Sequence, residues 1–391
     1  MRHLPWFVLI VVSGLSCVPN GTIVVHYTRL QDPGATPLQA DLRIGVTEGD
    51  PHLMFGDIRG IDAGSDGTIY VLDYQASEIR AYDQQGHYLR TLTRKGSGPG
   101  ELMEANGMVL VGDSALWIQD HSQWMMIAVD LNGEELTRVK MHVLSYGYVW
   151  NGTIDNEGRF WKPTTHSDEE RQYPPKEGLT EGHARAYLKS YDPRTDLADS
   201  LYVGELVYRT VIARNNRGGY TYRSVPYNAG TTTIVDPAGR FWQTAGSTYR
   251  IARLTERGDT AMMIEVAADP IPVTEKDRQR YVDQVAEQSP SDRRVAEEIA
   301  GLMPEFKPAI AGLAMDDVGH LWALRTTRDS EPATYDVFDA DGTYVAVVTL
   351  GFNASRYPSI RIRHGRVYAV IRDSLDVESV VRSEPLPETL R

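Results

Sequence analysis

The sequence feature that most constrains the fold is a short pattern that returns six times along the chain. Each copy has an apolar run, a polar turn that usually contains glycine, and a second apolar run with Tyr or Trp. GSDGTIYVLD, from Gly64 to Asp73, is the clearest copy. The repeat aromatics of the six copies are Tyr70, Trp117, Trp161, Trp242, Trp322 and Tyr368. Because glycine adopts positive φ without steric cost, and Asp or Asn bonds to nearby backbone, the pattern predicts a β-hairpin in each copy.

A second hairpin follows most copies, as in EIRAYDQQGHYLRTL from Glu78 to Leu92. Two consecutive hairpins form a four-stranded antiparallel sheet, which is the unit of a β-propeller blade. Successive repeat aromatics are 47, 44, 81, 80 and 46 residues apart, and the short spacings suit one blade each. The two long spacings could each hide a further blade, which would give eight, but neither contains another full copy of the first hairpin. We therefore expect an all-β fold, a six-bladed β-propeller of four-stranded antiparallel blades with insertions.

The sixth copy lacks an outer strand. Its third strand fits Val377 to Arg382, and Pro385 and Pro387 behind it cannot occupy a central strand because proline has no N–H to donate. The segment ADLRIGV, Ala40 to Val46, precedes the first copy and has no partner of its own. We predict that this N-terminal strand completes the last blade and closes the ring, which removes an open sheet edge.

Two insertions interrupt the β pattern. In residues 273–307, Thr274 begins an approximate capping box. Ser289, followed by Pro290 at the first helical position, marks a second helix start. Apolar residues at helical spacing predict two short amphipathic helices, which either pack as an embellishment or form a lid over one face. Residues 164–185 are polar and contain proline, so we expect a long loop there.

The N-terminal region has the features of an export signal. Residues 1–16 contain one Arg, an apolar run too short to span a bilayer, and then small residues, which is typical of a secretory signal peptide. Cys17, the only cysteine, follows directly and resembles the cysteine of a bacterial lipobox. The resemblance implies lipid attachment at Cys17; the alternative is ordinary cleavage beside an incidental cysteine. We expect residues 17–38 to be a linker and residues 39–391 to form the propeller, anchored in the bacterial cell envelope on its periplasmic side or at the cell surface.

The charge balance excludes one class of partner. The net charge is −13 and no stripe of Lys and Arg is present, whereas a nucleic-acid surface needs clustered basic residues. After Cys17 no run approaches the roughly 18 apolar residues of a membrane helix. We therefore expect a monomer that binds no nucleic acid and contacts the membrane through its lipid anchor only.

The sequence shows no residue pattern typical of catalysis or cofactor binding. It has no HxH or HExxH spacing and no GxSxG motif, and GSGPG at 96–100 lacks the Lys of a phosphate-binding loop. A single thiol excludes disulfides within the chain and thiolate metal sites. We assign no catalytic residue, no metal and no cofactor.

The most informative polar positions precede glycines at the start of the repeat copies. In four copies a glycine lies nine or ten residues before the repeat aromatic, after Arg59, Asn106, Asn151 and Ala311. The innermost strands of a propeller converge on its axis, where glycine fits the crowding. Arg59, Asn106 and Asn151 are thus predicted to lie near the channel mouth and to bind a small polar or anionic ligand. The alternative is ordinary channel lining bonded to water.

One stretch resembles a known repeat family. RKGSGPGEL, Arg94 to Leu102, with YVLD before it, is similar to the linker of an NHL-type repeat, and the layout resembles exported bacterial six-bladed β-propellers, many of them lipoproteins. The resemblance implies the fold, whereas such propellers serve as binding scaffolds and occasionally as enzymes. We expect a non-enzymatic binding or scaffold protein that holds a protein or small polar ligand on one face. The alternative is a metal-dependent enzyme of the lactonase or lyase kind with a channel-mouth site.

Overall fold

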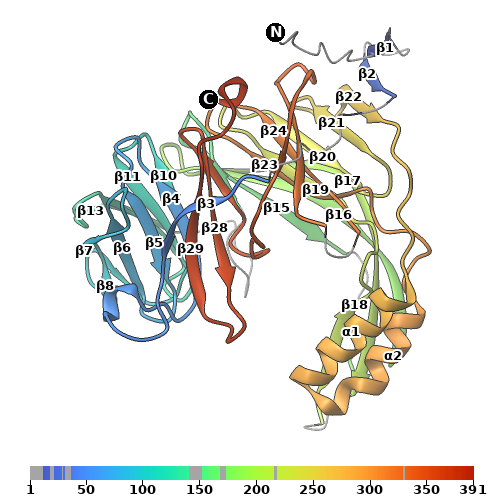
Figure 1. Ribbon diagram of the computed structural model, residues 1–391, viewed down its shortest axis with the longest axis horizontal. Coiled ribbons are helices and arrows are strands. Elements are labelled where there is room, and N and C mark those ends of the chain that lie inside the picture. The colour runs from blue at the N-terminus through green and yellow to red at the C-terminus, as the bar shows by residue number, and fades with distance from the viewer. Residues whose placement is uncertain are drawn as a thin grey trace, which may run out of the picture.

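The computed structural model describes residues 12–17, 22–28, 30, 37–140, 152–167, 173–214, 218–328 and 331–391. Six antiparallel sheets, the blades, account for most of these residues (Figure 1). Blade 1 contains β4 (Ile58–Ala63), β5 (Ile69–Asp73), β6 (Glu78–Tyr82) and β7 (Tyr88–Thr91). Blade 2 contains β10 (Ala105–Val111), β11 (Ala115–Asp120), β12 (Met125–Asp130) and β13 (Glu135–Lys140). Between them the short strands β8 (Arg94–Lys95) and β9 (Glu101–Leu102) pair in parallel.

The other four blades follow in chain order. Blade 3 contains β14 (Thr153–Ile154), β15 (Phe160–His166), β16 (Gly178–Asp192), β17 (Leu197–Arg214) and β18 (Tyr220–Ser224). Blade 4 contains β19 (Thr232–Val235), β20 (Phe241–Thr244), β21 (Arg250–Leu254) and β22 (Thr260–Val266). Blade 5 contains β23 (Ile310–Met315), β24 (Leu321–Arg325), β25 (Thr334–Phe338) and β26 (Tyr344–Thr349). Blade 6 contains β27 (Arg361–Arg363), β28 (Arg366–Arg372), β29 (Glu378–Ser383) and β3 (Ala40–Ile44).

The ring is closed by the N-terminal strand, as predicted. β3 pairs antiparallel with β29, with Ile44 opposite Val380 and Leu42 opposite Arg382. Blade 6 therefore has four strands, although its last strand precedes the first blade in the sequence. This pairing fills the edge that residues after Ser383 leave open.

The core consists of one apolar cluster between each blade and the next. Both sides of a blade are buried because alternate side chains of its strands point to opposite neighbours. In blade 1, Tyr70 and Leu72 join the cluster with blade 2, whereas Ile69 and Val71 join the cluster with blade 6. Four further clusters join blades 2 to 6 in sequence. The ring thus has six blades rather than eight, and each long spacing in the repeat holds an insertion.

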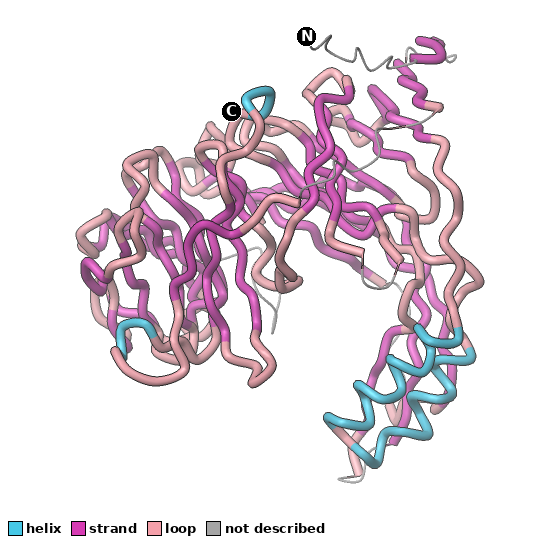
Figure 2. Tube along the Cα trace, viewed as in Figure 1, coloured by secondary structure: helices cyan, strands magenta, loops and turns pink. Residues whose placement is uncertain are grey.

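The two insertions combine into one projecting element. β16 and β17 have 15 and 18 residues, and their far ends, with β18, extend from blade 3 and pack against α1 (Glu275–Gln288) and α2 (Arg293–Gly301) (Figures 1 and 2). We call residues 178–184, 206–214, 218–225 and 273–307 the arm. Its core joins Val211 of β17 to Val282 and Ile299 of the helices.

Two predictions about the insertions need correction. The expected loop at 164–185 is found only in part, because 167 and 173–177 lie outside the strands, whereas 164–166 belong to β15 and 178–185 to β16. The polar composition is that of a strand ribbon exposed to solvent. The capping box at Thr274 is confirmed, with Asp277 as its second residue. Ser289 makes no side-chain capping bond, because Pro290 begins a 3-10 turn, η2 (Pro290–Asp292), and α2 starts only at Arg293.

A strand also occurs in the segment expected as a linker. β2 (Ile23–Tyr27) adds in parallel to the outer edge of blade 4, and β1 (Val12–Cys17) pairs with it. The Tyr27 hydroxyl donates to the Gly342 carbonyl at 2.9 Å and accepts from the Tyr344 N–H at 2.8 Å. Tyr27 is buried, so β2 is fastened to blades 4 and 5. Neither described helix is long and apolar enough to cross a membrane.

Candidate functional site

The arm and the starts of the innermost strands share one side of the propeller. In an antiparallel blade the first and third strands begin on one side, and the second and fourth end there. The arm grows from the start of β16 and the end of β17, and its helices connect the end of β22 with the start of β23. Arg59 and Asn106 lie at the starts of β4 and β10. We call this the arm side.

Arg59 lies in a β-bulge with three neighbours for its guanidinium group. The register between β4 and β5 shifts between Ile58 and Gly60. Arg59 Nη1 donates to Asn106 Oδ1 at 2.7 Å, and Nη2 lies 2.8 Å from Asp57 Oδ2. Its guanidinium carbon lies 3.4 Å from the centroid of the Tyr74 ring, a cation–π contact. These contacts hold the charge in place while 22% of the side chain stays exposed.

Asn106 occupies the equivalent bulge of blade 2 and is buried. The structure therefore brings two of the three predicted ligand-binding residues into direct contact, and Asn151 lies outside the described residues. The crowding argument holds at Gly60, where a Cβ would approach Met108 Cγ to 2.7 Å. It does not hold at Gly312, where nothing lies within 4 Å of such a Cβ.

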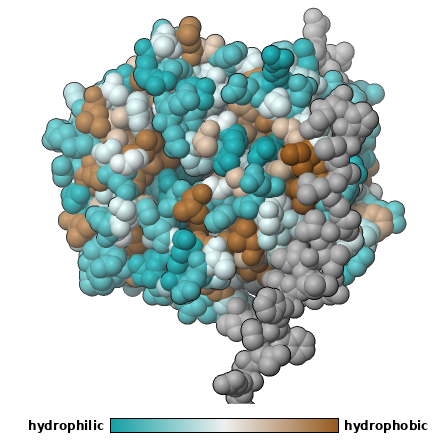
Figure 3. All heavy atoms as spheres, turned by 90° about the horizontal axis from the view of Figure 1, so that it is seen from above, coloured by the Kyte–Doolittle hydropathy of each residue, from teal (hydrophilic) through white to brown (hydrophobic). Residues whose placement is uncertain are grey.

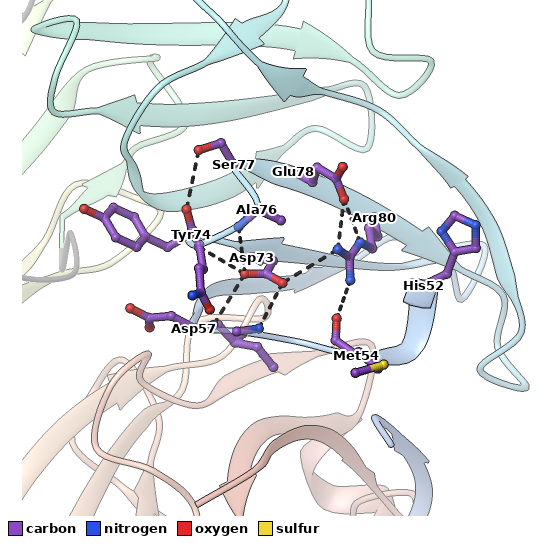
Figure 4. Close-up of polar contacts among 12 residues, drawn as sticks. His52, Met54, Asp57, Asp73, Tyr74, Ala76, Ser77, Glu78 and Arg80 are labelled. Carbon is purple, nitrogen blue, oxygen red and sulfur yellow. Dashed lines mark hydrogen bonds and ion pairs between the residues drawn. The ribbon is translucent and has the colours of Figure 1, made fainter. Parts of the chain in front are cut away.

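A polar network in blade 1 positions the loop before Arg59 (Figure 4). The buried Asp73 carboxylate accepts N–H bonds from Gly56 and Ala76. Arg80 donates to the Met54 carbonyl at 2.7 Å and to Glu78 at 3.0 Å. Sequence reasoning missed this network, because its members lie on three segments and no single motif contains them.

Blade 6 holds the start of β4 from the other side of the closure. The Glu378 carboxylate accepts the Ile58 N–H at 2.5 Å and lies 2.5 Å from Arg372 Nη2. Burial raises the pKa of Glu378, and the negative charge of Asp57 acts in the same direction. Charged groups of blades 6 and 1 thus lie on both sides of the start of β4, and the neutral Asn106 of blade 2 bonds to the last of them, Arg59.

Lys162 is a buried cation that sequence reasoning missed. It lies in β15 and is only 4% exposed. It shares a strand face with Phe160, which packs towards blade 2. No described residue forms a hydrogen bond or ion pair with its amine, and burial lowers the pKa of Lys162 to about 8. An unpaired buried amine can accept a proton or bind an anionic group. The signal in the sequence is a Lys directly after two aromatic residues of a buried strand.

A recess lies at the root of the arm between blades 3 and 4. Its volume is about 320 Å³. Its lining is uncharged and includes Thr164, Thr231, Tyr187 and Leu206. Hydroxyl groups and apolar surface suit a neutral polar group better than an ion.

Several acidic residues that could suggest chemistry are structural. In blades 3, 4 and 5 an Asp in the first turn accepts a bond from the indole N–H of the repeat Trp. The three acids are Asp155, Asp236 and Asp316. Each also accepts backbone N–H groups of its own turn, so its lone pairs are engaged. Over the described ranges no group of three or more His, Cys, Asp or Glu is placed to hold a metal ion.

Comparisons with known proteins agree on the architecture. Residues 51–173 match the model of a family, DUF5128, described as a 6-bladed beta-propeller. A member of the duf4221 family from Bacteroides vulgatus is 10% identical with a TM-score of 0.51, over 88% of this chain and 96% of that one. An exported protein from Bacteroides fragilis is 10% identical with a TM-score of 0.48, over 93% and 100%. Virginiamycin B lyase from Staphylococcus aureus is 10% identical with a TM-score of 0.40, over 84% and 94%. A comparison with curated proteins gives no match.

The chain is a six-bladed β-propeller. At identities of about 10% the similarity concerns the fold, and function has to be argued from the site.

Proposed function

We propose that this protein is a non-enzymatic binding propeller of the bacterial cell envelope that engages a partner protein on its arm side. The observation that supports this most is the arm itself. Two strands of one blade are extended and covered by two helices, so a folded element projects from the blades (Figure 1). An extension with a core of its own is a rigid platform for recognition.

Exposed aromatic side chains favour a protein partner. Tyr222 of β18 is 59% exposed, and Tyr173, shortly before β16, is 89% exposed. Tyrosine is enriched at protein–protein interfaces, because its ring contributes a large contact area and its hydroxyl bonds to polar groups. On the opposite side, seen in Figure 3, hydrophilic residues predominate and hydrophobic ones form small scattered groups.

The Arg59–Asn106 pair supplies a polar anchor near the axis. Arg59 is already oriented by Asp57, Asn106 and Tyr74, so it loses little side-chain freedom when it binds. Arg59→Ala should weaken binding of the partner tenfold or more, while the free energy of unfolding changes by no more than about 1 kcal/mol.

Site-specific photo-crosslinking in intact cells tests the proposal. A photoreactive residue replaces Tyr222 on the arm in one variant and Val318 in another. Val318 is 61% exposed in the turn between β23 and β24, on the opposite side. We expect a discrete crosslinked protein at position 222 that weakens in the Arg59→Ala background. Crosslinking at 318 alone, or equally at both positions, contradicts binding on the arm side.

We also propose that the protein is exported and attached to a membrane through a lipid on Cys17. The lipobox-like sequence supports this, and β2 begins six residues after Cys17. The outer edge of blade 4 would then lie close to the bilayer. Cys17→Ser should abolish labelling by a radioactive fatty acid and move the protein from the membrane to the supernatant fraction. Unchanged labelling in the Ser variant would show that Cys17 is not the attachment site.

A further inference from the structure

A second pocket lies on the side opposite the arm, where the ring closes. Its volume is about 420 Å³, and it lies between blade 6 and blade 1. Blade 1 contributes the turn Gly64–Gly67 and Gln84, and blade 6 contributes Arg366, Tyr368 and Arg382. Asp41, just after the start of β3, and His364, which is counted as neutral below, also line it.

The first turn of the sixth repeat copy differs from the first turns of blades 3 to 5. In blades 3 to 5 the residue six before the repeat aromatic is the turn Asp, which accepts the indole N–H at 2.7 to 3.3 Å. In blade 6 the residue at this place is Ile362, which belongs to the apolar cluster with blade 5. Only His364 and Gly365 separate β27 from β28. The first turn of blade 6 is therefore shorter than those of blades 3 to 5, and it carries no carboxylate that could accept a bond from Tyr368.

Tyr368 is the group that this change leaves without a protein partner. Its side chain is 2% exposed and packs between blades 6 and 1. It lines the pocket, and its hydroxyl makes no hydrogen bond to any described residue. The hydroxyl is not among the buried polar atoms that lack a partner, so it is open to the pocket, where water or a ligand can bond to it.

The charge of the lining determines what kind of partner fits. Two guanidinium groups face one carboxylate: Arg382 Nε donates to Asp41 Oδ1 at 2.9 Å, and Arg366 Nη1 bonds to Asp41 Oδ2. Arg382 also donates to the Gln84 carbonyl at 2.7 Å, and Arg366 to the Ser383 carbonyl at 2.8 Å. A guanidinium has five N–H donors, so both retain donors beyond these bonds. The lining thus carries one more positive than negative side chain, in a chain whose net charge is −13.

We propose that this pocket binds the anionic group of a small ligand, a carboxylate or a phosphate, which Tyr368, Arg366 and Arg382 hold together. The hydroxyl donates to the anion, and the arginines share their donors between the anion and Asp41. The site is distinct from the arm side, and it joins the first and last strands of the ring. Occupancy should therefore stabilise the closed ring, because a ligand that binds only the folded state raises the free energy of unfolding.

Calorimetric titration and thermal unfolding test this with two probes, inorganic phosphate and citrate, against sodium chloride at the same ionic strength. We expect saturable binding of at least one probe and a matching rise in Tm. Binding of citrate alone identifies a carboxylate ligand and binding of phosphate alone a phosphate ligand. Neither probe exceeding chloride overturns the proposal.

Two variants connect binding to the pocket. Tyr368→Phe removes only the hydroxyl and should weaken the bound probe about tenfold, since a bond to a charged group contributes about that much. Arg366→Gln should abolish binding. Tyr70→Phe, the equivalent change in blade 1 and outside the pocket, is the matched control and should bind like the wild type. Wild-type affinity in Tyr368→Phe, or an equal loss in Tyr70→Phe, would place the anion elsewhere.

Discussion

Lys162 is a buried cation in an environment that its charge disfavours. A buried ammonium normally has an acidic partner, because burial removes its hydration. In β15 it has none among the described residues, and its pKa falls to about 8 from an ordinary value of 10.5. Burial of this amine therefore lowers the free energy of unfolding by on the order of 3 kcal/mol, the value that corresponds to a pKa shift of this size.

Lys162→Met should raise the free energy of unfolding at pH 7 by about 1–3 kcal/mol, because it removes the buried charge and keeps most of the volume. The direction in which the free energy of unfolding changes with pH follows from the lowered pKa. Between pH 8 and 10.5 the unfolded chain still holds the proton that the folded one has released, so wild-type stability from this group rises with pH. The advantage of the Met variant should be full below pH 8 and fade towards pH 10.5.

Urea unfolding at pH 7 and at pH 9.5 checks this. Lys189→Met is the matched control, because Lys189 is opposite Lys162 in the β15–β16 pairing but exposed. It should change the free energy of unfolding by no more than about 0.5 kcal/mol. Destabilisation by Lys162→Met at pH 7 would mean that the amine has a favourable partner in the folded state.

At the scale of elements, two N-terminal strands add to the propeller in different ways. β3 supplies the fourth strand of blade 6, so without it the ring has an open edge and the cluster between blades 6 and 1 loses Ile44. β2 is a fifth strand on blade 4, whose four strands β19 to β22 are complete without it. Loss of β3 should therefore lower the free energy of unfolding far more than loss of β2.

Deleting residues 38–48 should abolish cooperative folding, whereas starting the chain at residue 31 should only lower Tm. The second truncation loses buried Val24, Val25 and Tyr27, but it leaves every blade with at least four strands. Circular dichroism and thermal unfolding of the two truncated proteins give the comparison. If removal of residues 38–48 leaves a cooperative transition at the wild-type Tm, β3 does not close the ring.

Blades 1 and 5 each pair an Asp with an Arg across their second and third strands, but the two residues exchange strands between the blades. In blade 1 the acid Asp73 is on the second strand and Arg80 on the third, whereas in blade 5 Arg325 is on the second strand and Asp336 on the third. Asp336 lies 2.5 Å from Arg325 and accepts the Tyr249 hydroxyl of blade 4. Burial raises the pKa of Asp336, and Arg325 opposes this rise. The repeat therefore preserves backbone geometry while its polar contacts differ from blade to blade.

On the scale of the whole molecule, the arm has a core separate from the ring. A buried ion pair fastens its helices, with Lys307 Nζ 2.7 Å from Asp277 Oδ1. The same Asp277 carboxylate accepts the Tyr227 hydroxyl at 3.3 Å and completes the Thr274 capping box. Regions with a cluster of their own can open without unfolding of the rest.

Lys307→Met should remove the nearest cation of the buried Asp277, which keeps only the more distant Arg280 Nη1 at 3.7 Å, and destabilise the arm by about 3 kcal/mol. Hydrogen exchange followed by mass spectrometry should show faster exchange in α1, α2 and β18, with unchanged protection in blades 1, 2 and 6. Glu298→Gln, an exposed change on α2, is the control and should leave exchange as in the wild type. Equal loss of protection across all six blades would show that arm and ring unfold as one unit.

The six blades and the two helices could be predicted from the sequence because each depends on local chemistry. The closing strand could be predicted because the last repeat copy lacks a fourth strand and the segment before the first copy lacks a partner. Turn residues, alternation of apolar side chains and a capping box act within about ten residues, so the chain displays them directly. The loop expected at 164–185 was wrong for 164–166 and 178–185, which are strands, for the same reason. Polar residues of a strand exposed on the arm lack the alternation that marks a half-buried strand.

From the sequence we could predict only that Arg59 and Asn106 lie near each other, not that they form a hydrogen bond. The partners of the other site residues could not be predicted. Lys162, the Asp73–Arg80 network and the pocket at Tyr368 depend on which side chains meet across blades, and Asp41 and Arg366 lie 325 positions apart in the chain. The sequence by itself determined the repeat and its number. Only the tertiary structure decided which polar groups form pairs, which lack a partner among the described residues and which meet between blades 6 and 1. Those contacts follow from the packing of whole sheets and leave no local pattern in the sequence.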